Sequence, residues 1–152
     1  MIKNVVCFLI LNFGALFIGA QFTGPGVNSD WYGLMNKAPW TPPGWFFGVA
    51  WTTIMICFSV FMARLVIVLK DWKLAIGLYA FQWMLNVIWN PVFFKFQAVG
   101  LALLVICTLT IIVGIYQFLY LKSLKKWSLL VLPYFLWLIV ATSLNSYALV
   151  YN

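Results

Sequence analysis

Three side-chain amides recur at helical spacing along a largely apolar stretch of the sequence. Gln82, Asn86 and Asn90 follow one another in i, i+4 steps, so a helix would carry all three on one face. Trp89 and Phe93 flank that face. If the stretch spans a membrane, the amides either line a cavity and orient the polar edge of a ligand, or they hydrogen-bond a neighbouring helix. A hydrogen bond of this kind between two membrane helices stabilises their association by about 0.6 kcal/mol.

Aromatic and polar residues share a face on two other stretches. Phe47, Trp51 and Met55 would lie on one face of a helix over residues 44–69. A helix over residues 128–151 would carry a similar stripe of Trp137, Ala141, Leu144, Asn145 and Ala148. The three stripes together predict a shared pocket for a flat aromatic ligand, which would stack on the rings and be oriented by the amides.

The residues needed for conventional catalysis are missing. The sequence contains no His, and its two carboxylates, Asp30 and Asp71, lie far apart and outside the apolar stretches. A paired-carboxylate site or a Ser-His-Asp triad cannot be assembled from them. Cys7, Cys57 and Cys107 are isolated and lack the spacing of metal ligands. Acid–base, nucleophilic and metal catalysis are therefore not expected.

The composition identifies the surroundings in which the chain folds. It is 66% hydrophobic and 7% charged, whereas an ordinary soluble domain is about 25% charged. A soluble fold is therefore excluded, and the expected surroundings are a lipid bilayer. The basic residues lie at the ends of apolar stretches, where they indicate membrane topology, so no nucleic-acid partner is expected.

Five apolar stretches are each long enough to cross a bilayer, which takes about 20 residues. They cover residues 5–22, 44–69, 74–94, 98–121 and 128–151. Short turns join the last four, and such turns place consecutive helices antiparallel. We therefore predict an all-α integral membrane protein, in which residues 1–152 form a single domain of five transmembrane helices in an up-down bundle.

The basic residues predict the orientation of this bundle. Seven of them fall on the side of the N-terminus: Lys3, Arg64, Lys70, Lys73, Lys122, Lys125 and Lys126. The opposite side carries only Lys37 and Lys95. Because basic residues favour the cytoplasmic side, the N-terminus is expected in the cytoplasm and the C-terminus outside.

The long first loop, residues 23–43, is expected to be structured. A short helix over residues 31–37 is predicted, with Asp30 as its N-cap. Three prolines between Pro39 and Pro43 would then stiffen the path into the next helix. The loop would suit a lid over a cavity; the alternative is an interfacial loop that anchors in lipid headgroups.

Three separated motifs carry a family resemblance. The first loop and the following helix contain Trp31, Tyr32, Leu34, Lys37, Trp40, Pro42, Pro43 and Trp51, in a W-Y-x-L-x-x-K string followed by W-x-P-P. The third stretch contains Gln82, Asn86, Trp89, Pro91, Phe93 and Phe94. The fifth contains Pro133, Tyr134, Trp137, Ala141, Thr142, Leu144 and Asn145. Together they resemble the TspO/translocator protein family, which comprises the tryptophan-rich sensory proteins and the peripheral benzodiazepine receptor, over essentially the whole chain.

The resemblance implies a multi-pass protein of a bacterial cell membrane that binds protoporphyrin IX or a related tetrapyrrole, and isoquinoline-type drugs. It needs no cofactor, because the porphyrin is a ligand. The ligand-binding residues that it implies are Tyr32, Trp40, Pro42, Phe47, Trp51, Asn86, Trp89, Asn90, Phe93, Trp137, Ala141, Leu144 and Asn145. For some bacterial members it also implies photo-oxidative porphyrin breakdown, for which Trp51 and Trp137 match the two required tryptophans.

Several alternatives stay open at this point. Porphyrin breakdown could be enzymatic turnover, or the ligand could act as its own photosensitiser. The protein could instead transport a porphyrin or a sterol, or serve as a structural helper in a membrane complex. Ala15 and Gly19 form a small-xxx-small step that predicts either a homodimer contact or a close neighbour within the chain.

Overall fold

The computed structural model describes residues 1–152 and contains helices but no strands. The elements are α1 (Ile2–Val27), α2 (Asp30–Leu34), α3 (Gly44–Val68), α4 (Lys73–Asn90), the π-helical turn η1 (Pro91–Lys95), α5 (Val99–Leu119), α6 (Leu121–Leu124), the 3-10 helix η2 (Lys125–Val131) and α7 (Leu132–Tyr151). The prediction of an all-α protein is confirmed.

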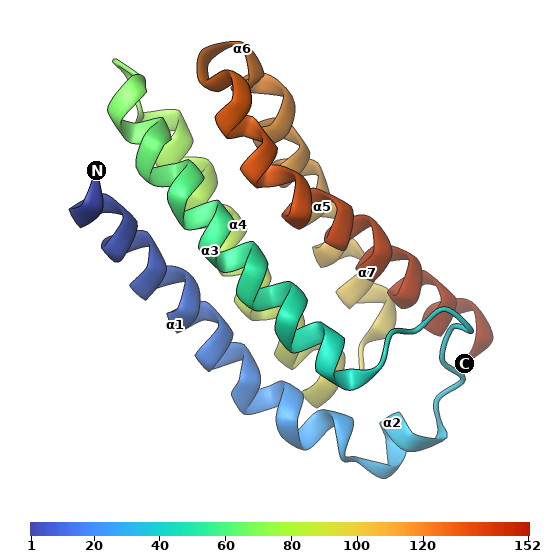
Figure 1. Cartoon of the computed structure of the whole chain (residues 1–152). Coiled ribbons are helices and arrows are strands. Elements are labelled where there is room, and N and C mark those ends of the chain that lie inside the picture. Colours follow the sequence, from blue (N-terminus) through green and yellow to red (C-terminus); the bar gives the residue numbers. More distant parts are fainter.

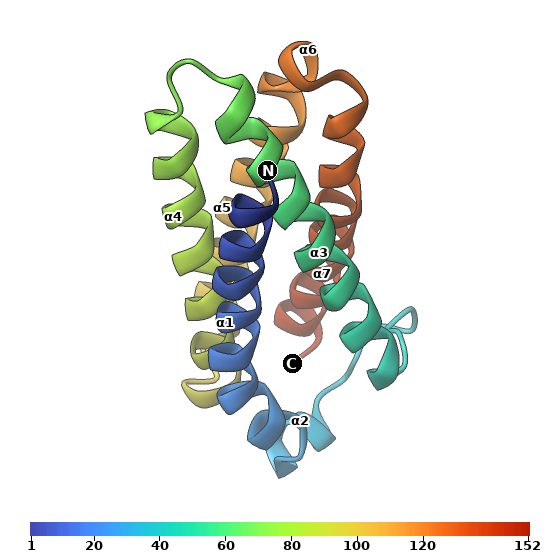
Figure 2. The same cartoon turned by 60° about the vertical axis from the view of Figure 1, so that its left-hand side comes forward.

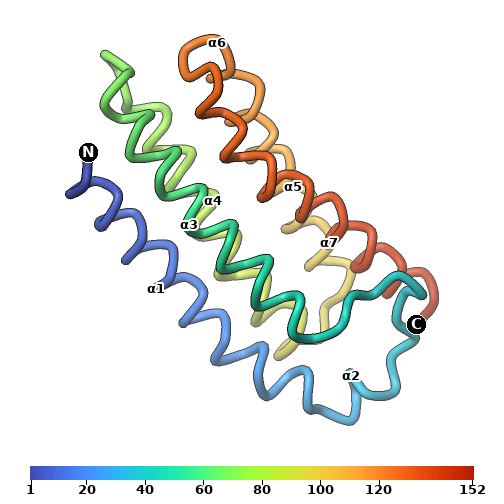
Figure 3. The backbone as a smooth tube through the Cα atoms, in the orientation of Figure 1, coloured from blue at the N-terminus to red at the C-terminus, as the bar shows by residue number.

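The long helices α1, α3, α4, α5 and α7 lie side by side along one common direction (Figure 1). Helix α1 packs on α3 and α4, and α7 packs on α5 and α3. The N-terminus and α6 lie toward one end of the bundle, whereas α2 and the C-terminus lie toward the other (Figure 2). In Figure 3 the backbone after α2 runs past the C-terminal end of α7 before it enters α3.

Four segments are long and apolar enough to cross a membrane: α1, α3, α5 and the combined segment Leu121–Tyr151. The four apolar helices are typical of an integral membrane protein. Helix α4 is the least apolar of the long helices, because its 18 residues include Lys73 and the three amides.

Helix α1 is longer than predicted. It starts at Ile2 and continues to Val27, so the connecting loop begins at residue 28 and the predicted boundary at residue 23 was wrong. The additional turn is held by packing against the end of α4 and η1. Thr23 Oγ1 donates to Asn90 Oδ1 at 2.7 Å, and Gly26 lies directly against the ring of Phe94.

The short loop helix α2 also differs from its prediction. It spans Asp30–Leu34 rather than residues 31–37, and its N-cap is Ser29 rather than Asp30. Ser29 Oγ accepts the backbone N–H of Tyr32 at 3.3 Å. The helix ends early because the next residues are held elsewhere: the backbone N–H of Asn36 donates to Oδ1 of Asn152 at 2.8 Å.

The third predicted helix, over residues 74–94, is not one regular α-helix. Its α-helical part ends at Asn90, and Pro91–Lys95 form a π-helical turn. Pro91 has no N–H to donate to the preceding turn, so the regular hydrogen-bond ladder is interrupted there. The fifth predicted helix likewise begins later than residue 128, because the 3-10 helix η2 precedes α7.

The interior is filled mainly in the half of the bundle near α6. The largest fully buried side chains there include Phe58, Phe61, Tyr116 and Tyr134, and they form one continuous hydrophobic cluster. Within this half, Asn12 is also buried and donates to Ser59 Oγ at 2.8 Å. The opposite half of the bundle, beside α2 and the first loop, is hollow.

Candidate functional site

A cavity of about 650 Å³ occupies the hollow half of the bundle. Helices α1, α3, α4, α5 and α7 and the first loop all contribute to its walls. Nine of the thirteen residues predicted from the sequence to bind ligand line it: Tyr32, Pro42, Phe47, Trp51, Asn86, Trp89, Asn90, Trp137 and Ala141. The bundle therefore brings together residues from all three stripes and from the first loop.

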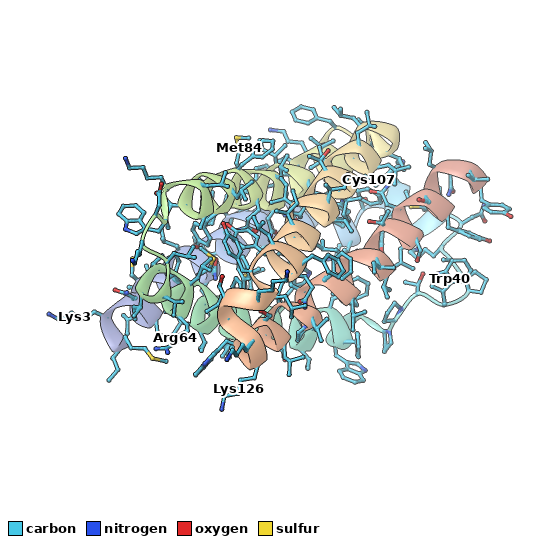
Figure 4. All side chains as sticks on the ribbon, turned by 90° about the horizontal axis from the view of Figure 1, so that it is seen from above. Lys3, Trp40, Arg64, Met84, Cys107 and Lys126 are labelled. Atoms are coloured by element: carbon cyan, nitrogen blue, oxygen red, sulfur yellow. The ribbon has the colours of Figure 1, made fainter.

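The four remaining predicted residues, Trp40, Phe93, Leu144 and Asn145, do not line the cavity. Trp40 is 54% exposed, and its indole N–H donates to Ser143 Oγ at 3.1 Å on the outside of α7. Figure 4 shows Trp40 at the outer edge of the molecule. Trp40 therefore attaches the loop to α7 rather than contributing a wall.

Phe93, Leu144 and Asn145 pack against other side chains instead of lining the cavity. Phe93 is buried in a small separate cluster and stacks on Trp89, with ring centroids 5.0 Å apart. Leu144 is half-buried on α7. Asn145 Oδ1 accepts the indole N–H of Trp89 at 3.1 Å, and its Nδ2 donates to the carbonyl of Val99 at 3.0 Å. Phe93 and Asn145 thus hold Trp89, which does line the cavity.

Trp137 has a polar atom that the protein leaves without a partner. The residue is 6% exposed, and its indole Nε1 is buried and makes no hydrogen bond. The rings of Phe46 and Phe47 pack against it at centroid distances of 5.8 and 5.2 Å. A buried donor without an acceptor costs about 1–3 kcal/mol. This atom is closed off from the cavity as well as from solvent, so it is the rest of the indole ring that lines the cavity.

The amide stripe both joins helices and lines the cavity. Asn86 Nδ2 donates to the hydroxyl of Tyr134 at 2.8 Å, and that hydroxyl donates to Gln82 Oε1 at 3.0 Å. These bonds connect α4 to α7, while Asn86 also borders the cavity. Trp51 packs edge-on against Tyr134, with centroids 6.0 Å apart, so this network also supports the cavity wall on α3.

Helix α1 contributes a cavity wall that the sequence reasoning missed. Ala15, Gly19 and Thr23 line the cavity at i, i+4 spacing. A Cβ added to Gly19 would lie 2.7 Å from Nδ2 of Asn90, so the small-xxx-small step faces α4 of the same chain. The repeated small residues were a usable signal, because a helix without large side chains leaves room beside it.

Lys37 also lines the cavity, although it was not among the ligand-binding residues predicted from the sequence. It is the one charged residue in the lining. Its Nζ donates to the carbonyl of Tyr32 at 2.7 Å and lies 4.4 Å from the centroid of the Tyr32 ring. Burial raises the pKa of the Tyr32 phenol, so Tyr32 is neutral at physiological pH and does not neutralise the ammonium. Lys37 belongs to the first-loop motif, which was the signal that could have identified it.

The lining contains no His, Cys, Asp or Glu. The chemistry that it offers is stacking on aromatic rings, hydrogen bonding by indole and amide groups, and the positive charge of one ammonium. Indole is also the side chain in this lining that gives up an electron most readily. A lining of this chemistry can stack on a flat aromatic molecule and hydrogen-bond a few polar atoms at its edge.

Comparison with known proteins gives a family match over almost the whole chain. The family model described as TspO/MBR family matches residues 6–150. A tryptophan-rich sensory protein from Cereibacter sphaeroides is 34% identical over 98% of this chain and 94% of its own length. A tryptophan-rich protein TspO from Chlorobaculum tepidum is 32% identical over 85% of this chain and 83% of its own. The translocator protein of Bos taurus is 35% identical over 57% of this chain and 53% of its own.

Proposed function

Because this chain is a membrane protein of the TspO/MBR family, we propose that it is a receptor that binds protoporphyrin IX or a related tetrapyrrole, and isoquinoline-type aromatic molecules, in the bundle cavity. The observation that carries the proposal is a cavity of about 650 Å³ whose lining combines Trp51, Trp89 and Trp137 with the amides of Asn86 and Asn90. That volume falls within the range of roughly 300–1,000 Å³ typical of small-molecule sites. The names of the relatives, a sensory protein and a translocator protein, fit a ligand-binding role.

Lys37 would make the cavity selective for ligands that carry a negative charge. The ammonium lies at the cavity, and no carboxylate of the chain lines it. A tetrapyrrole of the protoporphyrin type carries carboxylates on flexible side chains at one edge of a flat ring. Such a carboxylate could reach Lys37 while the ring lies between the tryptophans, and a charge-assisted hydrogen bond is about twice as strong as a neutral one.

Replacing Lys37 with Met is expected to weaken protoporphyrin IX binding roughly tenfold, which corresponds to about 1.4 kcal/mol. Binding is measured by the saturable quenching of tryptophan fluorescence in detergent-purified protein. Lys37→Arg keeps the charge and should bind nearly as well as the parent protein. Absence of saturable quenching in the parent protein would refute the proposed function itself.

The dimethyl ester of protoporphyrin IX serves as the matched ligand, because it keeps the ring and removes both negative charges. The parent protein should bind the ester about as weakly as Lys37→Met binds the free acid. Lys37→Met should not weaken binding of the ester any further. An equal loss for both ligands would show instead that Lys37 only holds the loop through the carbonyl of Tyr32.

We further propose that light drives breakdown of the bound porphyrin with the help of Trp51 and Trp137. Both tryptophans line the cavity. In this step one electron passes from an indole to the photoexcited porphyrin, which leaves an indole radical cation and a porphyrin radical anion. Dioxygen adds to the reduced ring, and the oxygenated ring returns one electron to the indole radical cation, so that the indole is restored and the ring carries both oxygen atoms when it opens. No acid–base residue is required for the electron transfer, in keeping with a lining that contains no His, Cys, Asp or Glu.

The proposed topology has five spans, with α4 and η1 crossing the membrane together, an N-terminus in the cytoplasm and a C-terminus outside. Two observations support it. The two termini lie at opposite ends of the bundle, and Lys3, Arg64 and Lys126 lie on the side away from Trp40 (Figure 4). Because basic residues favour the cytoplasmic side, the end with the N-terminus is assigned to the cytoplasm.

A reporter fused after Asn152 tests this topology. An enzyme that is active only outside the cytoplasm is expected to be active at this position, because the orientation follows from seven basic residues against two. The same reporter fused after Lys70, in the turn between α3 and α4, should be inactive. An active reporter after Lys70 together with an inactive one after Asn152 would reverse the orientation.

A further inference from the structure

A second cavity, of about 410 Å³, lies at the opposite end of the bundle from the first. It is formed by the end of α3 and by the connection between α6 and α7. Its lining consists of Arg64, Val68, Ser123, Leu124, Lys125, Lys126 and Trp127. None of these residues belongs to the aromatic cavity.

The charge of this second cavity is entirely positive. Arg64, Lys125 and Lys126 line it, whereas neither carboxylate of the chain does. Asp71, the carboxylate at the same end of the bundle, accepts the backbone N–H of Lys73 at 3.0 Å within its own turn. Three cations that converge without a counter-ion create a strong preference for an anionic guest.

Arg64 is held in place with part of its hydrogen-bonding capacity unused. Its neighbours Ala63 and Leu65 are fully buried in the core, which fixes the direction of the side chain. The guanidinium lies over the ring of Trp127, 5.7 Å from the centroid. Its Nε is buried and has no hydrogen-bond partner. The planar guanidinium donates well to phosphate oxygens, which are acceptors of matching geometry.

The backbone that carries the two lysines is itself fixed in an unusual conformation. Lys125 has φ 49°, in the left-handed region that L side chains rarely adopt. Leu124, the residue before it, is 2% exposed and anchors the turn in the core. Lys125, Lys126 and Trp127 begin the 3-10 helix η2 at this turn, and all three line the cavity together with Arg64.

The position of the cavity indicates the source of the anion. It lies where the apolar helix α3 and the apolar segment Leu121–Tyr151 reach one end of the bundle. In a bilayer that these helices span, the lipid headgroups lie at the helix ends. Val68, Leu124 and Trp127 add apolar walls beside the cations. Basic pockets between helices at a membrane surface suit anionic headgroups. We propose that this cavity binds the phosphate of an anionic phospholipid from the adjacent leaflet.

The test compares lipid binding to purified protein by native mass spectrometry, with dioleoylphosphatidylglycerol and dioleoylphosphatidylcholine as probes. The parent protein should retain phosphatidylglycerol in preference to phosphatidylcholine. The double variant Lys125→Gln/Lys126→Gln should bind phosphatidylglycerol roughly 25-fold more weakly, because each lysine near a membrane surface contributes about 1 kcal/mol. Lys125→Arg/Lys126→Arg should restore binding.

The matched control is Lys70→Gln/Lys73→Gln, which removes the same charge from the same end of the bundle but not from this cavity. The control should keep the affinity of the parent protein. Equal weakening of both double variants would overturn the proposal, since binding would then follow the overall surface charge. If Lys125→Gln/Lys126→Gln does not fold, the exposed residue Lys126 is replaced alone, with a loss of roughly fivefold expected.

Competition with inorganic phosphate distinguishes a lipid site from a site for a soluble anion. A tenfold molar excess of phosphate over phosphatidylglycerol should leave the lipid bound, because the apolar walls contact only the lipid. Displacement of the lipid by phosphate, or equal retention of the two phospholipids, would overturn the assignment to an anionic lipid.

Discussion

Replacing both Trp51 and Trp137 with Phe is expected to remove most of the light-driven loss of porphyrin absorbance while weakening porphyrin binding only modestly. Phe keeps a ring for stacking, and an aromatic pair contributes about 0.5–1.5 kcal/mol beyond the area that it buries. Phe is much harder to oxidise than Trp, so electron transfer to the excited porphyrin should nearly cease.

Breakdown is measured as absorbance loss under fixed light, at a porphyrin concentration that saturates each variant. Trp72→Phe is the control: Trp72 lies between α3 and α4 and does not line the cavity, so its replacement should change neither property. Undiminished breakdown in the double variant would exclude both tryptophans as electron donors. The protein would then bind tetrapyrroles without assisting their oxidation.

Gly26→Ala is expected to destabilise the protein by about 3 kcal/mol, the upper end of the usual cost of overpacking. A Cβ at residue 26 would lie 2.5 Å from both Cβ and Cγ of Phe94. These atoms are close to the backbone of η1, so a change of side-chain rotamer cannot move Phe94 Cβ away. The rings of Tyr32 and Trp89 pack on Phe94 at centroid distances of 5.7 and 5.9 Å, so porphyrin affinity should fall as well.

Gly24→Ala provides the control for this variant. Gly24 is in the same turn of α1, but an added Cβ would have no atom within 4 Å. In a helix, Ala is more stable than Gly by roughly 0.8–1.0 kcal/mol, so Gly24→Ala should raise Tm slightly. Tm and the porphyrin Kd are measured on the same preparations. Equal Tm values for the two variants would show that α1 does not pack on Phe94 as described.

The sequence predicted the helical class and most of the helices because both depend on local properties. A long apolar stretch with few charges can satisfy its backbone in a membrane only as a helix, whatever its neighbours are. The i, i+4 spacing likewise places Gln82, Asn86 and Asn90 on one face without any knowledge of the fold. Helix ends were less predictable, since Ser29 and Asp30 are both good N-caps and only the path of the chain selects Ser29.

The candidate site was predicted only in part, because periodicity gives the face of a residue but not its depth along the bundle or its neighbours. Asn145 shares the α7 stripe with Trp137, yet it does not line the cavity and instead accepts a hydrogen bond from Trp89. Trp40 was expected at the ligand and lies instead on the outside of α7. No spacing rule could show that the Nζ atom of Lys37 lies over the ring of Tyr32.

The sequence by itself therefore determined that this protein is helical, lies in a membrane, contains no His and only two carboxylates, and carries the motifs of its family. Composition, helical period and motif spacing are properties of the chain and require no partner segment. Only the tertiary structure decided that one half of the bundle is filled and the other is hollow. A cavity exists where side chains from several helices fail to meet, and that depends on how small residues such as Gly19 on α1 face amides such as Asn90 on α4.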